Sequence, residues 1–111
     1  MADTPTARTL RYLREQGYCA EVVERWIPQA RKRKDLFGFA DIAGLHPAHA
    51  GVLLVQCTSG SHHAARRTKL ASLATVQLAL QAGCQVQIIS WTQQRATRRW
   101  VARVESVTAA D

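Results

Sequence analysis

The sequence lacks any long apolar run. No stretch of about 18 apolar residues occurs in its 111 residues, so we expect no membrane-spanning helix. No basic segment followed by an apolar one opens the chain, and we therefore expect no secretory signal. Low-complexity segments, internal repeats and linkers are also missing, and 47% of the residues are hydrophobic. These features predict one globular domain over residues 1–111 with no membrane partner.

Cysteine is also scarce. The three cysteines, Cys19, Cys57 and Cys84, are odd in number, widely spaced and placed in apolar segments. A disulfide framework needs an even number of paired thiols, so this pattern favours buried free thiols in a reducing compartment. We therefore expect a cytoplasmic protein.

Acidic residues are few, and the middle of the chain has none. Eight Asp and Glu face fifteen Lys and Arg, for a net charge of +7, and no acid lies between Asp41 and Glu105. This balance is typical of a protein that binds a polyanion such as DNA. The residues that we expect to contact a phosphate backbone are Arg31, Lys32, Arg33, Lys34, Arg66 and Arg67.

The order of elements predicts an α/β fold. A helix is expected to begin at Pro5, capped by Thr4 or Asp3, and to stop at Gly17. Strands are expected at 18–27, 36–45, 52–57, 84–89 and 100–107, with a basic loop at 28–34 and a turn at 46–51. A long helix is expected at 62–81, capped by residues 59–61. The order αβββαββ predicts a mixed central sheet flanked by helices.

One pattern of polar residues stands out on two of these strands. Asp41 lies in the segment 35–42, and Gln56-Cys57-Thr58 follows fifteen residues later, at the end of the apolar strand 52–57. The pattern places one carboxylate beside an amide and a hydroxyl on what read as neighbouring strands.

These motifs resemble the PD-(D/E)XK nuclease superfamily, and in particular archaeal-type Holliday-junction resolvases and their phage-encoded relatives. The motifs that carry the resemblance are Leu13-Arg14-Glu15-Gln16-Gly17-Tyr18, Arg33-Lys34-Asp35, Ala40-Asp41-Ile42 and Val52-Leu53-Leu54-Val55-Gln56-Cys57-Thr58-Ser59. Together with the elements between them they cover roughly residues 6–89. The resemblance implies a restriction-endonuclease-like core and hydrolysis of DNA with Mg²⁺ or Mn²⁺.

The resemblance also implies roles for individual residues. Asp41 matches the family's Asp, Gln56 stands where a Glu is usual, and Thr58 stands where a Lys is usual. A hydroxyl supplies no positive charge, but Lys69, on the following helix, could reach back toward the site. We therefore assign catalysis to Asp41, Gln56, Thr58 and Lys69, and metal binding to Asp41, Gln56 and Cys57.

Other acidic and basic groups leave alternatives open. The family's first-helix Glu would fall near Thr6, so the acids that could substitute from a distance are Glu15, Glu21 and Glu24. Asp35 is either a secondary acid of the site or the carboxylate of a turn. Arg66 or Arg67 could neutralise a phosphate but would be poor bases.

Histidine and tryptophan side chains allow further interpretations. His46, His49, His62 and His63 do not have the spacing of a common zinc site with Cys57, and we expect His62 and His63 to meet solvent or phosphate. Trp26, Trp91 and Trp100 could stack on bases, but they lie in strand-like segments, and we expect them in the core or at an interface.

The sequence thus predicts a DNA-binding protein, an endonuclease that acts on branched or structured DNA as a homodimer. An apolar strand near the C-terminus could supply the dimer interface. The alternative is a nuclease-fold protein that binds nucleic acid without cutting it. A protein-interaction module of unrelated function would instead show no salt-sensitive DNA binding.

Overall fold

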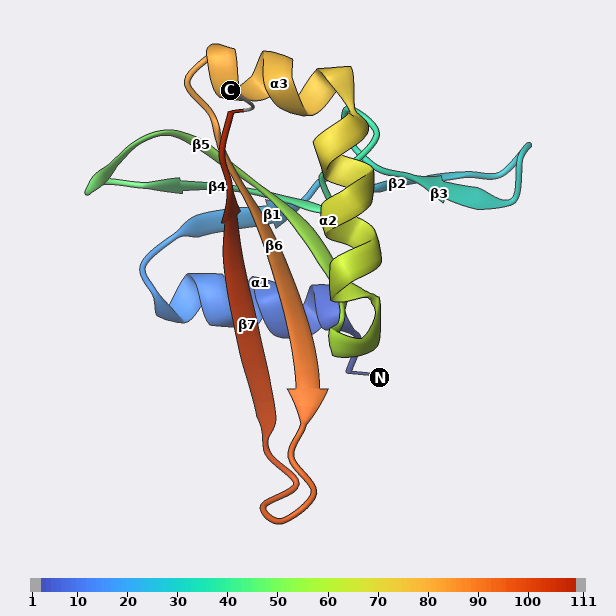
Figure 1. Ribbon diagram of the computed structural model, residues 1–111, viewed down its shortest axis with the longest axis vertical. Coiled ribbons are helices and arrows are strands. Elements are labelled where there is room, and N and C mark those ends of the chain that lie inside the picture. The colour runs from blue at the N-terminus through green and yellow to red at the C-terminus, as the bar shows by residue number, and fades with distance from the viewer. Residues whose placement is uncertain (1–2, 110–111) are drawn as a thin grey trace.

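A mixed five-stranded sheet forms the centre of the protein, with α1 on one face and α2 and α3 on the other (Figure 1). The computed structural model describes residues 3–109. The helices are α1 (Pro5–Glu15), the 3-10 turn η1 (Gly60–His62), α2 (His63–Ser72) and α3 (Ala74–Gln81). The strands are β1 (Cys19–Val22), β2 (Arg25–Ile27), β3 (Lys32–Lys34), β4 (Ile42–His46), β5 (His49–Ser59), β6 (Gln85–Gln93) and β7 (Trp100–Val107).

The central sheet has the order β1-β4-β5-β6-β7. Among the strands within residues 3–109, only β5 and β6 pair in parallel, and the chain between them crosses over through η1, α2 and α3. A parallel pair needs such a crossover because its strands start at the same end of the sheet. The predicted α/β class and mixed sheet are therefore confirmed.

Each face of the sheet has its own apolar core. Leu13 of α1 packs with Leu53, Val55 and Ile89 on one face, and Leu70 of α2 belongs to the cluster on the other. Residues 53–58 of β5 are all buried, as predicted for a strand covered on both faces. Among residues 3–109, no helix is long and apolar enough to span a membrane.

The predicted strand 18–27 and basic loop 28–34 are wrong in part. The chain leaves the central sheet after Val22, and β2 and β3 form a separate two-stranded hairpin that projects from the body (Figure 1). All three residues of β3 are exposed. Their side chains show no apolar alternation, which is why residues 32–34 read as a loop.

The next predicted strand, 36–45, begins late. Residues 35–41 form a tight turn with an isolated bridge between Leu36 and Ala40, and regular pairing starts only at Ile42. Phe37 and Gly38 both have positive φ, which a strand does not allow. The strands predicted at 52–57 and 84–89 are longer, because β5 starts at His49 and β6 runs to Gln93.

The predicted helix 62–81 is two helices. Leu73 has an extended backbone between α2 and α3, and the Ser72 hydroxyl donates to the Lys69 carbonyl 2.9 Å away, which satisfies a carbonyl at the helix end. The predicted serine cap is also wrong. Gly60–His62 forms a 3-10 turn, and Ser59 Oγ lies 2.8 Å from His62 Nδ1 instead of capping a main-chain amide.

At the N-terminus the predicted cap is confirmed. Thr4 accepts a hydrogen bond from the Ala7 amide, Pro5 opens α1, and Gly17 follows its end with φ +96. The cysteines are free, but only Cys57 is fully buried. Cys19 is exposed because β1 is an edge strand of the sheet, so the prediction of three buried thiols is wrong for it.

Candidate active site

Asp41 is the last residue of the turn 35–41, immediately before β4, and is 4% exposed. Its amide donates to the Val55 carbonyl (2.8 Å), and its own carbonyl accepts from the Val23 amide (2.9 Å), so main-chain bonds on both sides fix its position. Its carboxylate Oδ2 accepts from Gln56 Nε2 (2.9 Å) and from the Cys57 amide (2.8 Å). The residue predicted as the leading acid is therefore held rigidly between β1 and β5.

Two further acids meet Asp41. One carboxylate oxygen from each of Glu24, Asp35 and Asp41 lies within 4.8 Å of the others. The hairpin explains this proximity, because Glu24 precedes β2, Asp35 follows β3, and the adjacent residues Arg25 and Lys34 are cross-strand partners. We call these three residues the carboxylate cluster.

Burial and repulsion make Asp41 unusual. Its pKa is raised to about 8; desolvation by burial is the main cause, and the neighbouring Asp35 and Glu24 carboxylates act in the same direction. The hydrogen bond from the Cys57 amide acts in the opposite direction. A cation among the three carboxylates would favour the ionised form of Asp41, since opposite charge stabilises a carboxylate.

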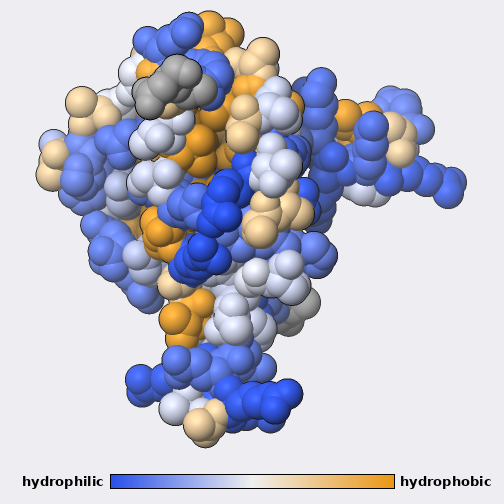
Figure 2. All heavy atoms as spheres, in the orientation of Figure 1, coloured by the Kyte–Doolittle hydropathy of each residue, from blue (hydrophilic) through white to orange (hydrophobic). Residues whose placement is uncertain are grey.

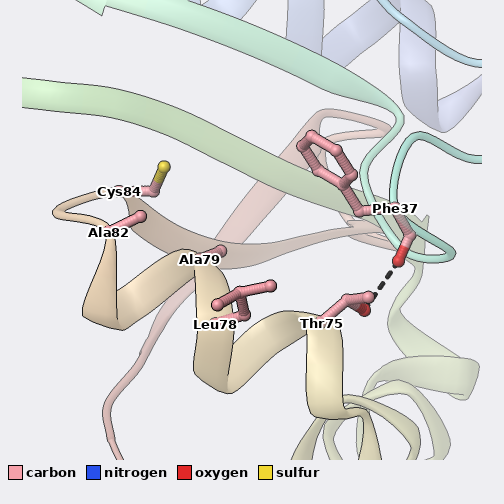
Figure 3. Close-up of a pocket in the computed structure, with 6 residues that line it drawn as sticks. All are labelled: Phe37, Thr75, Leu78, Ala79, Ala82 and Cys84. Atoms are coloured by element: carbon pink, nitrogen blue, oxygen red, sulfur yellow. Dashed lines mark hydrogen bonds between the residues drawn. The ribbon is translucent and has the colours of Figure 1, made fainter.

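The turn between Asp35 and Asp41 sets the distance between these two acids. The Gly38 amide donates to the Asp35 carbonyl (3.1 Å), and Phe37 adopts φ +58 at the tip. The Thr75 hydroxyl of α3 donates to the Phe37 carbonyl at 2.7 Å, which ties the turn to the helix layer (Figure 3). An apolar pocket of about 180 Å³ lies beside this contact, between Phe37 and α3.

The Lys69 side chain lies next to Asp35 and Gln56, which answers a question that the sequence leaves open. Its Nζ lies 3.8 Å from Asp35 Oδ2 and 3.5 Å from Gln56 Oε1. The Gln56 amide therefore links the Asp41 carboxylate to the Lys69 ammonium group, because its nitrogen faces Asp41 and its oxygen faces Lys69. For Gln56 to bind a metal beside Asp41 through oxygen, the amide must turn over.

The other predicted site residues lie in different positions. Thr58 is buried on the same face of β5 as Gln56, one pleat further along. The Cys57 thiol belongs to the apolar cluster on the α1 face, and burial raises its pKa to about 12. Cys57 therefore contributes its backbone amide to this site, while its thiol lies on the other face of the sheet.

Arg66 and Arg67 diverge. Arg66 lies one turn before Lys69, on the same side of α2, and its buried Nε has no hydrogen-bond partner among the described residues. Arg67 instead makes two hydrogen bonds to Glu105 on β7, at 2.7 and 2.6 Å. The Arg67 guanidinium is thus held by a carboxylate outside the carboxylate cluster.

His63 belongs to the same network as Arg67. It is 1% exposed, with Nδ1 2.6 Å from Ser90 Oγ and Nε2 3.0 Å from Glu105 Oε1. The expectation that His63 meets solvent or phosphate is therefore wrong. Hydrogen bonds from Arg67 and His63 lower the pKa of Glu105 to about 2. This network therefore contains a salt bridge that connects α2 to β7 at the edge of the sheet.

The tryptophans also depart from expectation in part. Trp91 is partly buried and donates to Thr9 Oγ1 at 2.9 Å. Trp26 and Trp100 are 54% and 42% exposed, so neither is a core residue. The Arg8 guanidinium covers the Trp100 ring at 3.5 Å from its centroid, whereas no ring or cation contact of that kind is present at Trp26 among residues 3–109.

Sequence reasoning weighted the acids differently from the structure. Glu24 was only a distant substitute and Asp35 an open alternative, yet both lie beside Asp41. The one local signal for the hairpin is the turn-forming Pro28 between residues 25–27 and 32–34, and these segments lack the apolar alternation that would identify them as paired strands. Glu21 lies apart from the carboxylate cluster and faces Arg14 at 3.9 Å.

Comparisons with known proteins do not assign this chain to a family. No family model, no curated protein and no solved structure matches this chain.

Proposed function

We propose that this protein is a restriction-endonuclease-like nuclease that hydrolyses phosphodiester bonds in DNA with Mg²⁺ or Mn²⁺. One observation carries the proposal. Three carboxylates lie within 4.8 Å of one another, and the ammonium group of Lys69 is 3.8 Å from one of them. Acids for a hard cation and a separate positive charge for a phosphate are what this reaction needs.

The residues present fit such a cation. Mg²⁺ and Mn²⁺ prefer oxygen ligands, and the carboxylate cluster offers only carboxylate oxygens, from Glu24, Asp35 and Asp41. When bound there, the ion would supply Lewis-acid polarisation of a phosphate oxygen. The cluster includes Glu24 and Asp35, which the resemblance did not assign to the metal, in addition to Asp41, which it did.

Lys69 would act on the phosphate. Its side chain is 36% exposed, so the ammonium group can leave Asp35 and Gln56 and contact an incoming anion. The resemblance places a lysine where Thr58 stands, and the geometry gives Lys69 the means to supply that charge from α2. Gln56 would orient both partners, since it bonds to Asp41 and to Lys69.

The partner surface adjoins this cluster. The exposed basic residues Lys32, Arg33 and Lys34 form β3, and Arg33 donates to Glu24 at 3.0 Å. Figure 2 shows the projecting hairpin as a mostly hydrophilic surface. A basic arm that starts at the acids would hold a DNA backbone close to them, which supports DNA as the substrate.

Branched DNA and a homodimer remain parts of the proposal that rest on the family resemblance. The order α1, three strands of the central sheet, α2 and α3, then two more strands agrees with the core that the resemblance implies. A second copy would use β7, which is an edge strand with exposed apolar side chains at Trp100, Val101 and Val104.

A protein that binds DNA without cutting it is the second candidate, and Asp41 favours it. Oδ2 of Asp41 is already satisfied by two protein donors, and the pKa near 8 favours a neutral acid at neutral pH in the absence of a cation. Such a site would be stable without metal. The two candidates therefore differ in whether a cation displaces the proton.

A cleavage assay separates the candidates. The purified chain is incubated with a labelled four-way junction, a flap and a linear duplex, in Mg²⁺, in Mn²⁺ and in EDTA. The proposal expects metal-dependent cutting of the branched DNA that Asp41→Asn abolishes. The matched control is Glu21→Gln, an acid outside the cluster, prepared in the same way.

Each outcome points to one candidate. Salt-sensitive binding without cutting in either metal would sink the nuclease proposal and favour the second candidate. Cutting that survives in Asp41→Asn would assign the activity to a contaminant or to a different site. Sedimentation of the free chain tests the dimer separately, and a monomer at all concentrations would contradict it.

A further inference from the structure

The β2–β3 hairpin carries an exposed tryptophan on the face that leads to the carboxylate cluster. Trp26 is 54% exposed and is the cross-strand partner of Arg33. Opposed residues of an antiparallel pair project on the same side, with Cβ atoms about 5 Å apart. Trp26 and Arg33 therefore form one polar and aromatic patch, which we call the Trp26 face.

Contacts of Arg33 show where this face points. The Arg33 guanidinium bonds to Glu24 at 3.0 Å, so Glu24 lies on the same face as Trp26. Strand residues two apart are separated by roughly 7 Å. The indole of Trp26 is thus one pleat away from the carboxylate cluster, on the arm that begins there.

The charges of the hairpin select an anionic partner. Arg33 remains 66% exposed and bonds to Glu24 through one terminal nitrogen only, so its other N–H donors stay available for a phosphate. Arg25, Lys32 and Lys34 add positive charge on the opposite face of the same ribbon. An exposed aromatic ring beside a cation, on a ribbon that is basic on both faces, suits an unpaired base, because the base stacks on the ring while its backbone lies along the charges.

We propose that Trp26 stacks on an unpaired base next to the phosphate held at the carboxylate cluster, with Arg33 on the adjoining backbone. The hairpin therefore selects DNA with an unpaired nucleotide, such as a fork, flap or open junction, over a continuous duplex. In a duplex the faces of the bases are already stacked on their neighbours, so Trp26 has no partner there. This inference deepens the proposed function and rests on it for the position of the phosphate.

Binding to matched DNA tests the stacking. Fluorescence anisotropy compares a forked duplex with a continuous duplex of the same sequence, with Ca²⁺ in place of Mg²⁺ to separate binding from hydrolysis. Wild-type protein is expected to prefer the fork, and Trp26→Ala is expected to lose about 5- to 150-fold in affinity for it. Trp26→Phe keeps most of the preference, and affinity for the duplex changes little.

Two further readouts separate stacking from charge and from folding. A 2-aminopurine at the unpaired position should be quenched by wild-type protein and not by Trp26→Ala. Lys32→Ala should weaken fork and duplex alike and reduce the salt slope by about 1, which Trp26→Ala should not do. Leu78→Ala is the matched control, because it removes another large exposed apolar side chain, on α3 and outside the hairpin.

The outcomes distinguish this inference from the proposed nuclease. A fork preference that depends on Trp26 without cutting in Mg²⁺ supports the inference and contradicts the nuclease. Cutting with an unchanged fork preference in Trp26→Ala overturns the inference and leaves the nuclease intact. A Trp26→Ala variant that alters self-association but not DNA binding assigns the indole to a protein interface and overturns it as well.

Discussion

The Lys69 ammonium group lies 3.8 Å from the Asp35 carboxylate, although Lys69 belongs to α2 and Asp35 to the turn after β3. The same ammonium group is 3.5 Å from Gln56 on β5. Side chains from three separate elements thus meet at the Lys69 ammonium group, beside the carboxylate cluster. Because Thr58 offers only a hydroxyl, Lys69 is the residue that would supply the positive charge on β5's side of the site.

Removing that charge should affect catalysis more than folding. Lys69→Met is expected to lower the rate of DNA cleavage by about 100-fold or more, since one charge aimed at the reacting phosphate is lost. Its effect on the free energy of unfolding should stay below about 1 kcal/mol, because a partly exposed ion pair contributes little. Single-turnover cleavage and urea unfolding measure the two quantities.

Lys32→Met is the matched control for Lys69→Met. It removes the same group from the exposed strand β3, and we expect it to weaken DNA binding while the rate at saturating protein stays near the wild-type value. Equal cleavage rates for Lys69→Met and the wild type would show that another side chain supplies the positive charge to the phosphate. Arg66, on the same side of α2, is the alternative.

Addition of Mg²⁺ or Mn²⁺ should stabilise the fold through the carboxylate cluster. A cation bound there, as proposed, would relieve repulsion among three acids that the folded chain brings within 4.8 Å of one another. At 100 times the dissociation constant the expected gain is about 2.7 kcal/mol, seen as a rise in Tm. Asp35→Asn should lose most of this rise, and Glu21→Gln should keep it. An equal rise in Asp35→Asn would place the cation outside the cluster.

The contrast between Asp41 and Glu24 shows how far the sequence reaches. Asp41 and Gln56 lie in or next to strands whose apolar pattern is visible, so the sequence predicts that these two meet, whereas it leaves open whether Lys69 joins them from the following helix. Glu24 joins them only because the chain leaves the sheet after Val22 and returns through a hairpin. The residues of that hairpin are almost all exposed, so burial leaves no alternation from which its pairing could be inferred.

His63 shows a second limit of sequence reasoning. A histidine at the start of a basic helix is expected to face solvent, but Ser90 and Glu105 come from two strands that lie far along the chain. Their contacts depend on the parallel pairing of β5 with β6 and on β7 closing the edge of the sheet. Tertiary partners of this kind turn a surface position into a buried one, and no local pattern encodes them.

The network of Glu105 predicts a specific pH dependence. Its pKa lies at about 2, below the ordinary 4.5, so the folded state favours the ionised form. A lowered pKa contributes stability that is present above pH 4.5 and is lost as the pH falls toward 2. Glu105→Gln should therefore have a free energy of unfolding roughly 1 kcal/mol lower than that of the wild type at pH 6, and a lower urea midpoint. This difference in stability should shrink below pH 4.5.

Glu15→Gln is the reference for that comparison. Glu15 is exposed at the end of α1, away from Arg67 and His63, so its replacement should show no such narrowing. Urea midpoints at pH 6, 4 and 3 for the three proteins test this directly. If the urea midpoints of Glu105→Gln and the wild type differed by the same amount at all three pH values, this would contradict a stabilising salt bridge between α2 and β7.

Two glycines with the same backbone conformation should differ in their tolerance of alanine. Gly38, in the turn between Asp35 and Asp41, has φ +83, and Gly51, on β5, has φ +80. A Cβ at Gly38 would meet open space, whereas a Cβ at Gly51 would overlap the main-chain carbonyl oxygen of Gly83. Gly38→Ala should thus cost only the backbone strain, about 1 to 2 kcal/mol.

Gly51→Ala adds a collision that no side-chain rotation can relieve. Because the atom that the new Cβ would meet is the main-chain oxygen of Gly83, either β5 or the turn before β6 must shift. Such a shift would disturb the parallel pairing of β5 with β6 inside the sheet. We expect Gly51→Ala to lose about 3 kcal/mol or more in urea unfolding, clearly beyond Gly38→Ala. Equal losses would mean that the approach of Gly51 to Gly83 is looser than the structure has it. Such looseness would also free the strand that carries Gln56.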